Sequence, residues 1–424
     1  MTSTHESAAV PQSPSPAARS RPHDGYRVGE TGYRRIAVAL FAAGVATFAL
    51  LYSTQALLPE LAAAFSVSAA QSTLSLSLAT VGLGVALLVA GPLSEVVGRT
   101  RLIHLSLTVS ALVALACAVA PDWNVLLGLR LLQGITLAGL PSVATAYLRE
   151  ELHADTHARA AGLYIGGTAL GGMTGRLVTG VVADAAGWRW GLAAVAGVGM
   201  ISAAVVLFTL PPSRNFLAAP ARIAHLATMT RRAVSDRGLL ALYAIGACSM
   251  GAFVAVYNAM GFRLTSAPFH LSLGAAGLVF LVYPIGTLSS TVAGRLADRF
   301  SRRTVVPIGC LITVAGVLLT VLSSLPVVVL GLAIMTAGFF VVHGVSSGWV
   351  PTRAHAGGVA SGQAASLYLF AYYVGSSVFG SLAGRAWTLG AWPAVVLLAL
   401  TLVALSGLLA AWLRHIPSLD PARR

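Results

Sequence analysis

Twelve consecutive stretches of about 20 mostly apolar residues dominate the sequence and constrain its fold more than any other feature. A helix of this length crosses the hydrocarbon core of a bilayer with every backbone polar group hydrogen-bonded internally. The stretches cover residues 36–58, 69–93, 102–120, 123–148, 160–183, 189–210, 239–261, 273–294, 304–322, 327–349, 359–383 and 391–413. They predict an all-α polytopic membrane protein with twelve transmembrane helices.

The scarcity of charged residues supports this interpretation. Only 9% of the residues are charged and 57% are hydrophobic, whereas soluble domains contain about 25% charged residues. This composition excludes an ordinary soluble enzyme. Cys117, Cys248 and Cys310 all lie inside apolar stretches, so the cysteines form neither a disulfide framework nor a zinc-binding spacing.

The positions of the arginines predict the orientation of the chain. All 27 basic residues are arginines. Apart from two inside apolar stretches, only Arg189, Arg263 and Arg385 lie on the side opposite the termini. Because positive charge concentrates in cytoplasmic loops, we expect both termini in the cytoplasm and a multi-pass protein of the cytoplasmic membrane. The net charge of +14 then serves orientation and contact with membrane lipids, not binding of nucleic acid.

The two halves of the sequence repeat each other at an offset of 204 residues. The matching pairs are Phe65 and Phe269, Ser68 and Ser272, Gly82 and Gly286, Gly171 and Gly375, Gly180 and Gly384, and Trp188 and Trp392. This repeat predicts two six-helix bundles related by a pseudo-twofold axis along the membrane normal.

The repeat and the charged segments together predict the division of the chain. We expect a disordered cytoplasmic tail (1–33), an N-terminal bundle (34–210), a cytoplasmic linker (211–238), a C-terminal bundle (239–413) and a short cytoplasmic tail (414–424). In the linker, Ile223, Leu226 and Met229 recur at helical spacing, which fits either a short helix on the membrane surface or a plain connector.

A loop motif between the second and third stretches is repeated in the second half. The first copy contains Gly91, Glu95, Gly98, Arg99 and Arg101, and the second contains Gly294, Asp298, Arg302 and Arg303. This doubled motif, on twelve predicted spans in two halves, resembles the signature loop of the major facilitator superfamily. The sequence Arg130-Leu-Leu-Gln133-Gly134 is similar to another element of that family. The segments from Tyr52 to Pro59 and from Gly171 to Arg176 resemble its twelve-helix bacterial efflux permeases, a branch like the drug:proton antiporters.

The resemblance implies a role for the two acidic residues of the loop motif. In the family this residue docks across the boundary between the halves, which places Glu95 near 358–361 and Asp298 near 159–162. A carboxylate at the positive N-terminal end of a helix would act as a latch. The alternative is that these charges only orient the loops.

Two arginines lie inside apolar stretches, where each costs about 2.5–3.5 kcal/mol on insertion scales. Arg130 and Arg176 both belong to the half of the membrane remote from the termini. One interpretation places them on an aqueous cavity, where they bind substrate or bias a proton acceptor. The other is a structural network of ion pairs, with Glu60 and Asp184 as partners, or of capped backbone carbonyls.

The family fold lines its pathway with the first, fourth, seventh and tenth spans, and this implies which polar residues contact substrate. The substrate-binding candidates are Tyr52, Gln55, Arg130, Gln133, Arg176, Tyr257, Asn258 and His343, with Tyr164 and Tyr372 as possible additions. Proton coupling needs a carboxylate or histidine in a partly desolvated place, and the candidates are Glu60, Asp184 and His343. A packing role is the alternative for His343.

These features favour a secondary transporter that works by alternating access, with proton-coupled efflux of a small amphipathic molecule, such as a drug or metabolite, as the main hypothesis. The alternative is transport of a small anionic metabolite by Arg130 and Arg176. No nucleotide-binding loop is present in the sequence, and we expect no enzymatic activity, no cofactor, no metal and a monomer.

Two short patterns suggest other chemistry. Gly344-Val-Ser346-Ser-Gly348 fits the nucleophile elbow of hydrolases, but it lies inside an apolar stretch where the required strand is not expected. A membrane hydrolase or sensor is therefore the less favoured third hypothesis. His153, Asp155 and His157 could ligate a metal only in an extended loop, and no fourth ligand is evident.

Overall fold

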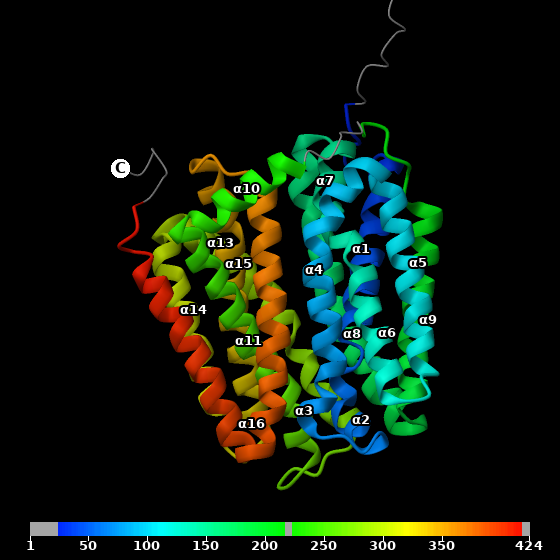
Figure 1. Ribbon diagram of the computed structural model, residues 1–424, viewed down its shortest axis with the longest axis vertical. Coiled ribbons are helices and arrows are strands. Elements are labelled where there is room, and N and C mark those ends of the chain that lie inside the picture. Colours follow the sequence, from blue (N-terminus) through cyan, green and yellow to red (C-terminus); the bar gives the residue numbers. More distant parts are fainter. Residues whose placement is uncertain (1–23, 217–222, 418–424) are drawn as a thin grey trace, which may run out of the picture.

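The computed structural model describes residues 24–216 and 223–417, and most of these residues are helical (Figure 1). The first half contains α1 (Thr31–Tyr52), α2 (Leu58–Ala64), α3 (Ala69–Ser72), α4 (Leu74–Val97), α5 (Arg99–Ala118), α6 (Trp123–Leu137), α7 (Gly139–Glu151), α8 (His157–Ala186) and α9 (Trp188–Thr209). The second half contains α10 (Ile223–Ser235), α11 (Arg237–Thr265), α12 (Leu273–Gly277), α13 (Pro284–Phe300), α14 (Arg302–Leu319), α15 (Leu325–Ala356) and α16 (Ser361–Trp412).

These helices confirm the predicted all-α membrane fold. Ten helices or helix pairs in the described residues are long and apolar enough to cross a membrane. The 52-residue helix α16 contains two of the predicted spans, because the backbone leaves the helical conformation at Gly390 and Ala391. Figure 1 shows its first arm (361–389) and its second arm (392–412) running in opposite directions. The 30-residue helix α8 coincides with the fifth predicted span.

The first span is interrupted, which the apolar pattern did not predict. Helix α1 ends at Tyr52, a 3₁₀ turn follows at Gln55–Leu57, and α2 begins with Pro59 in its first turn. A proline fits there because the first N–H groups of a helix have no intrahelical partner. The interruption leaves the last carbonyl groups of α1 available to other donors.

The two bundles pair their helices in the same way. Helix α1 packs against α8, α4 against α6 and α5 against α9, while α11 packs against the first arm of α16, α13 against α15 and α14 against the second arm. Glycines permit the closest of these approaches. A Cβ atom on Gly171 would collide with the carbonyl oxygen of Val45, and one on the equivalent Gly375 would collide with that of Ala247. Small residues therefore set the spacing of equivalent helix pairs in both halves.

An arginine stacked on a tryptophan caps the equivalent helix in each bundle. Arg189 lies 4.2 Å from the ring centroid of Trp188 and donates a 2.9 Å hydrogen bond to the Ala120 carbonyl, just after α5. Arg263 lies 4.5 Å from the ring of Trp392 and donates to carbonyl groups at 320–322, just after α14. The guanidinium groups thus satisfy carbonyl oxygens left unpaired at two helix ends.

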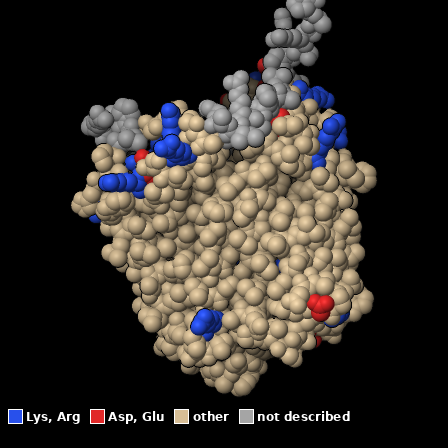
Figure 2. Space-filling view, viewed as in Figure 1, with Lys and Arg blue, Asp and Glu red and all other residues tan. Residues whose placement is uncertain are grey.

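The two bundles contact each other at the end that lies opposite the described chain termini. Helix α4 packs against the first arm of α16, and α8 packs against α12. In the described residues, hydrogen bonds join Ser77 to Ser381 (2.8 Å), Thr80 to Ser377 (2.7 Å), Gln55 to Asn258 (2.6 Å) and Asp184 to Ser272 (2.8 Å). We call this end of the molecule the closed end, and the end that bears the described termini the arginine-rich end. Figure 2 shows charged side chains gathered at the arginine-rich end above a band that is almost free of charge.

The structure corrects the predicted end of the tail and shows a helix in the linker. The backbone of Tyr26 exchanges hydrogen bonds with Glu151 and His153, at 2.9 and 3.1 Å, so the predicted disordered tail does not extend to residue 33. The linker contains the helix α10, and Thr230 on this helix accepts a 2.8 Å hydrogen bond from Gln363. Residues 1–23, 217–222 and 418–424 lie outside the described part of the chain.

Candidate functional site

A hydrogen bond between Gln55 and Asn258 lies at the centre of the interface between the bundles. The Gln55 Nε2 atom donates to Asn258 Oδ1 at 2.6 Å, and both side chains are almost completely buried. The two residues are 203 positions apart, close to the offset of the repeat, so they occupy equivalent places in the first and seventh spans. A contact between equivalent residues marks the pseudo-twofold axis. Two of the predicted substrate-binding residues thus lie where the bundles meet.

Arg176 extends this pair and makes it asymmetric. Its Nε atom donates to Gln55 Oε1 and its Nη1 atom donates to the Gly172 carbonyl, both at 2.5 Å. In the second half, Asn258 donates to the carbonyl of Gly380, which is the repeat equivalent of Arg176. The N-terminal bundle therefore supplies a guanidinium group where the C-terminal bundle supplies only backbone.

Aromatic rings from both bundles enclose the Arg176 guanidinium. Its central carbon lies 4.1 Å from the ring centroid of Tyr52 in the N-terminal bundle, and 4.5 Å and 5.0 Å from those of Tyr283 and Phe280 in the C-terminal bundle. Such distances are typical of cation–π interactions, which strengthen when the cation is removed from water. Arg176 is 1% exposed. The group therefore bridges the two bundles at their shared interface.

Two further predicted residues lie in the aromatic part of the C-terminal bundle. The Tyr257 hydroxyl is 2.8 Å from that of Thr336, and its ring stacks on Phe280 with the centroids 5.4 Å apart. The half-buried His343 has its Nδ1 atom 3.0 Å from the Tyr368 hydroxyl. Its ring lies 4.7 Å from that of Tyr372. Tyr257 thus joins the rings around Arg176, and His343 lies among the neighbouring rings.

Arg130 has a different environment from Arg176. It is completely buried and donates to the backbone carbonyls of Leu50, Leu51 and Ser75 and to the side chains of Ser53 and Gln133. The carbonyls of residues 50 and 51 belong to the last turn of α1, whose end carries partial negative charge. Of the two sequence hypotheses, carbonyl capping describes these contacts. Arg130 and Gln133 therefore lie inside the N-terminal bundle and outside the central group.

The predicted ion pairs of the two arginines with Glu60 and Asp184 are not formed. Glu60 accepts a 2.8 Å hydrogen bond from the Trp188 backbone N–H and so caps the start of α9. Asp184 Oδ2 accepts a 2.8 Å hydrogen bond from the Ser272 hydroxyl, directly before α12. Similar depth in the membrane suggested these pairs, but both carboxylates instead lie at helix N-termini, which carry the complementary partial charge.

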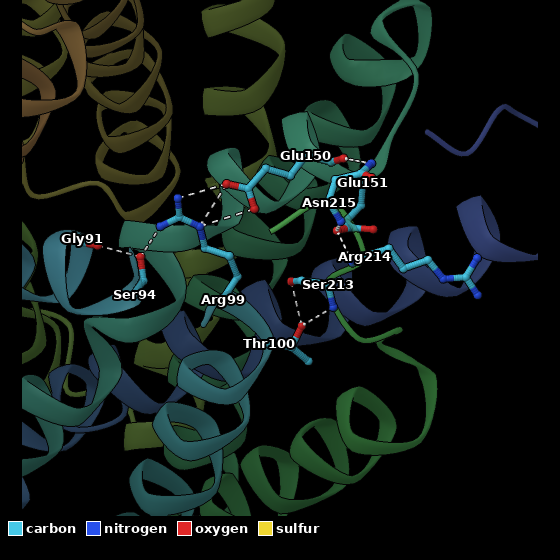
Figure 3. A network of polar contacts seen from close by, with 9 residues as sticks. All are labelled: Gly91, Ser94, Arg99, Thr100, Glu150, Glu151, Ser213, Arg214 and Asn215. Carbon is cyan, nitrogen blue, oxygen red and sulfur yellow. Dashed lines mark hydrogen bonds and ion pairs between the residues drawn. The ribbon is translucent and has the colours of Figure 1, made fainter. Parts of the chain in front are cut away.

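The signature loop of the first half is tied to its own bundle (Figure 3). Arg99 contacts the Ser94 hydroxyl and forms an ion pair with Glu150, with Nη2 3.0 Å from Oε1. Gly98, with φ +101°, ends α4 in a conformation that a glycine adopts without strain. The Glu151 carboxylate next to this pair accepts the backbone N–H groups at 214 and 215, so the start of the linker is held at the same place.

The acidic residues of both loop motifs are exposed and have no polar contact in the described residues. Neither Glu95 nor Asp298 touches the segments at 358–361 and 159–162, so the predicted latches are not formed in this conformation. Arg303 donates to carbonyl groups at 414 and 416. In the rest of the predicted loop set, the Gly91 carbonyl accepts a hydrogen bond from the Ser94 hydroxyl, and the Arg99 guanidinium lies 5.6 Å from the ring centroid of Phe216 in the linker.

An apolar cleft opens between α8 and α13 on the arginine-rich side of Arg176. Its volume is about 370 Å³, and its lining includes Met173, Leu170, Pro284 and Leu288. Met173 lies three residues before Arg176 on the same helix. Pro284 comes directly after Tyr283, whose ring covers the guanidinium. The cleft therefore ends within one helical turn of the central charge.

The two patterns that suggested other chemistry have ordinary structural roles. Ser346 is buried within helix α15, so no strand precedes it as a nucleophile elbow would require. His153 lies 3.3 Å from Asp155 and also contacts Arg27, whereas His157 contacts the Leu152 carbonyl. No group of three potential metal ligands occurs in residues 24–216 and 223–417.

Sequence reasoning missed several residues of the interface. The hydroxyl pairs of Ser77 with Ser381 and of Thr80 with Ser377, and the rings of Phe280 and Tyr283, were not among the candidates. Hydroxyl groups three or four residues apart on otherwise apolar helices were the available signal for the first set. The aromatic residues had none, because aromatic residues are common in any apolar span.

Two helical bundles that enclose polar residues at their shared interface define a polytopic membrane transporter. The sequence profile described as Major Facilitator Superfamily matches residues 37–290 and 264–424. The chain belongs to this superfamily.

Two bacterial relatives match most of the chain. The inner membrane transport protein YnfM of Escherichia coli (strain K12) is 40% identical over 309 residues, 73% of each chain. The uncharacterized MFS-type transporter YybF of Bacillus subtilis (strain 168) is 38% identical over 310 residues, which cover 73% of this chain and 76% of that one.

Two solved structures share the fold at low sequence identity. A bacterial homolog of the human lysosomal transporter Spinster, in an inward-facing and unoccupied conformation, matches with a TM-score of 0.73 at 16% identity, over 93% of this chain and 100% of that one. The nucleoside transporter NupG matches with a TM-score of 0.69 at 15% identity, over 90% and 99% of the two chains.

Proposed function

We propose that this protein exports a small amphipathic molecule across the cytoplasmic membrane by alternating access, driven by protons. In this proposal the arginine-rich end faces the cytoplasm and the closed end faces the outside, as the distribution of arginines favours. The substrate binds around Gln55, Arg176, Tyr52 and Asn258, between the bundles, and the bundles rock about this site.

The distribution of contacts between the bundles is the observation that carries the proposal. Hydrogen bonds join the bundles at the closed end, and the carboxylates of Glu95 and Asp298 at the arginine-rich end have no partners among the described residues. A transporter that alternates must break one set of contacts as it makes the other. In this proposal the present conformation is the inward-facing state, and the two loop carboxylates dock in the outward-facing state.

Proton coupling needs a titratable group whose environment changes with the conformation. Asp184 meets this condition, because its 2.8 Å contact with Ser272 joins the two bundles and must break when the closed end opens. Protonation would weaken the attraction of this carboxylate to the start of α12. Glu60, which caps α9, and His343, which lies in the aromatic group, are the other proposed coupling groups.

The test is transport by the purified full-length protein in proteoliposomes with an imposed pH gradient, across cationic, neutral and anionic amphipathic compounds. We expect the gradient to drive net movement of at least one compound. We also expect Asp184→Asn to reduce the response to the gradient.

Asp122→Asn is the matched control for this substitution. Asp122 also caps a helix at the closed end, through a 3.0 Å hydrogen bond from the Val125 N–H, but its contact stays within the N-terminal bundle. Asparagine is as good an N-cap as aspartate, so this variant should keep the wild-type response. Fluxes that do not depend on the gradient would contradict proton coupling, and absence of flux for every compound would contradict the transport proposal itself.

A further inference from the structure

Arg176 carries a buried positive charge that no acidic residue in the described chain balances. The ion pairs in residues 24–216 and 223–417 involve other groups, and the hydrogen-bond acceptors of Arg176 are neutral and include the Gln55 amide and the Gly172 carbonyl. Buried charges in proteins are normally paired, because removal of an ion from water is costly. Aromatic rings compensate part of this cost, but they supply no counter-charge.

Two other buried arginines, Arg130 and Arg263, show what full compensation looks like here. Arg130 donates to five oxygen atoms, among them two carbonyls at the end of α1, and Arg263 donates to three carbonyls that follow α14. In both cases the negative end of a helix faces the guanidinium. Arg176 contacts one backbone carbonyl, that of Gly172 within its own helix, and retains N–H donors for a ligand.

The surroundings of Arg176 define the rest of the ligand. The adjoining cleft of about 370 Å³ is lined mostly by apolar side chains, and its lining includes Met173 on the helix of Arg176 and Pro284, the residue directly after Tyr283. This volume lies in the range of small-molecule sites, in which apolar walls hold the body of the ligand and a few polar groups orient it. A planar carboxylate matches the fork of donors on a guanidinium.

We infer that Arg176 is the receptor for the anionic group of the substrate, and that the substrate is a small amphipathic organic anion with one carboxylate and an apolar or aromatic body. This inference rests on the proposed transport function and adds the substrate class to it. The carboxylate takes the place of the missing counter-charge at Arg176, and the body of the substrate occupies the cleft between α8 and α13.

The inference is tested by binding and by counterflow with compounds that differ only in charge. The probes are benzoate and 2-naphthoate, the corresponding amides, and the corresponding arylmethylamines. Binding is measured by calorimetry on the purified full-length protein, and counterflow is measured in proteoliposomes. We expect a carboxylate to bind at least tenfold more tightly than its amide, and the amine to bind least.

Substitutions of Arg176 test whether the preference for carboxylate ligands depends on this residue. Arg176→Gln should weaken carboxylate binding at least tenfold and leave amide binding within about threefold of wild type. Arg176→Lys keeps the charge but loses the planar fork, so carboxylate binding should fall by less. Arg385→Gln is the control, because this exposed arginine lies at the closed end and its loss changes the net charge equally. The elution profile in gel filtration establishes that each variant is folded.

The outcomes separate this inference from the function on which it rests. Carboxylate binding that survives in Arg176→Gln, failure of both carboxylates to bind, or preference for the amine would overturn the anion receptor, even if the protein transports another class of compound. Carboxylate binding that depends on Arg176 without counterflow would support the receptor and contradict transport.

Discussion

Substitution of Asn258 by leucine should shift the protein away from the conformation closed at the end remote from the termini. The side chain of Asn258 accepts the hydrogen bond from Gln55 Nε2, and the donor is 1% exposed. Leucine has the same number of side-chain heavy atoms and the same branching at Cγ but no acceptor, so Asn258→Leu leaves a buried amide without a partner in the closed conformation. In the open conformation, water reaches the same amide and no penalty arises.

The size of the shift follows from the cost of the unpaired donor. An unsatisfied buried polar group costs about 1–3 kcal/mol, which corresponds to about a 5-fold to 150-fold change in the equilibrium between the closed and open conformations. The variant Gln55→Leu is less informative, because it also removes an acceptor of Arg176.

Distances between spin labels can measure this equilibrium. Asn124 and Ser323 are exposed, belong to different bundles and lie at the closed end, so nitroxides at these positions report its opening. The native cysteines are all buried and do not compete for the label. We expect Asn258→Leu to increase the population of long distances by at least fivefold relative to the short ones.

A matched variant separates this effect from general damage. Gln363 donates a 2.8 Å hydrogen bond to Thr230 on the linker helix, away from the interface between the bundles, so Gln363→Leu should leave the distances unchanged. The reasoning fails if Asn258→Leu changes the population less than twofold, or if Gln363→Leu has the same effect.

Two further predictions concern stability. Arg130→Gln should lower the thermal midpoint of the purified protein by an amount that corresponds to about 1–3 kcal/mol for each carbonyl left unpaired, because it leaves buried carbonyls at the end of α1 without their donor. An unchanged midpoint would show that these carbonyls find other partners. Burial acts to raise the pKa of Asp236, but hydrogen bonds from Arg353 and from backbone N–H groups outweigh it and lower this pKa below its ordinary value of 3.8. The stabilisation by this pair is therefore complete above about pH 3.8 and is lost as the pH falls through the lowered pKa. Thermal midpoints from pH 7 to pH 3 should fall less steeply in Asp236→Asn than in the wild type, and parallel curves would contradict this account.

The sequence predicted that Arg130 and Arg176 lie inside apolar spans, but it did not predict that their hydrogen-bond partners differ. Arg130 and Arg176 look alike along the chain, since both interrupt apolar spans at similar depth. Their acceptors differ because Arg130 meets the interrupted end of α1, whereas Arg176 meets the neutral amide of Gln55. The sequence left ion pairs with Glu60 and Asp184 and capped backbone carbonyls as alternatives, because it did not predict the interruption of α1 that exposes these carbonyls to Arg130.

For the candidate site as well, the sequence predicted residues but not the contacts between them. Polar residues in apolar spans are few, and the resemblance to the family implied which spans line the pathway, so Gln55 and Asn258 could be named as candidates from the sequence. Their contact depends on the bundles being closed at that level, which is a property of one conformation. Contacts of Glu95 and Asp298 belong, in the proposed cycle, to the other conformation, and one structure contains only one of the two sets.

By itself the sequence determined that the chain crosses a membrane many times, that its halves repeat and that positive charge gathers on one side, because hydropathy, periodicity and charge are additive properties of neighbouring residues. Tertiary structure alone decided which bundle ends touch, which buried guanidinium is fully capped and which one lies uncompensated among aromatic rings from both halves. Those facts depend on groups that are 55 to 304 residues apart and on backbone atoms that every residue shares, so the order of side chains does not encode them locally.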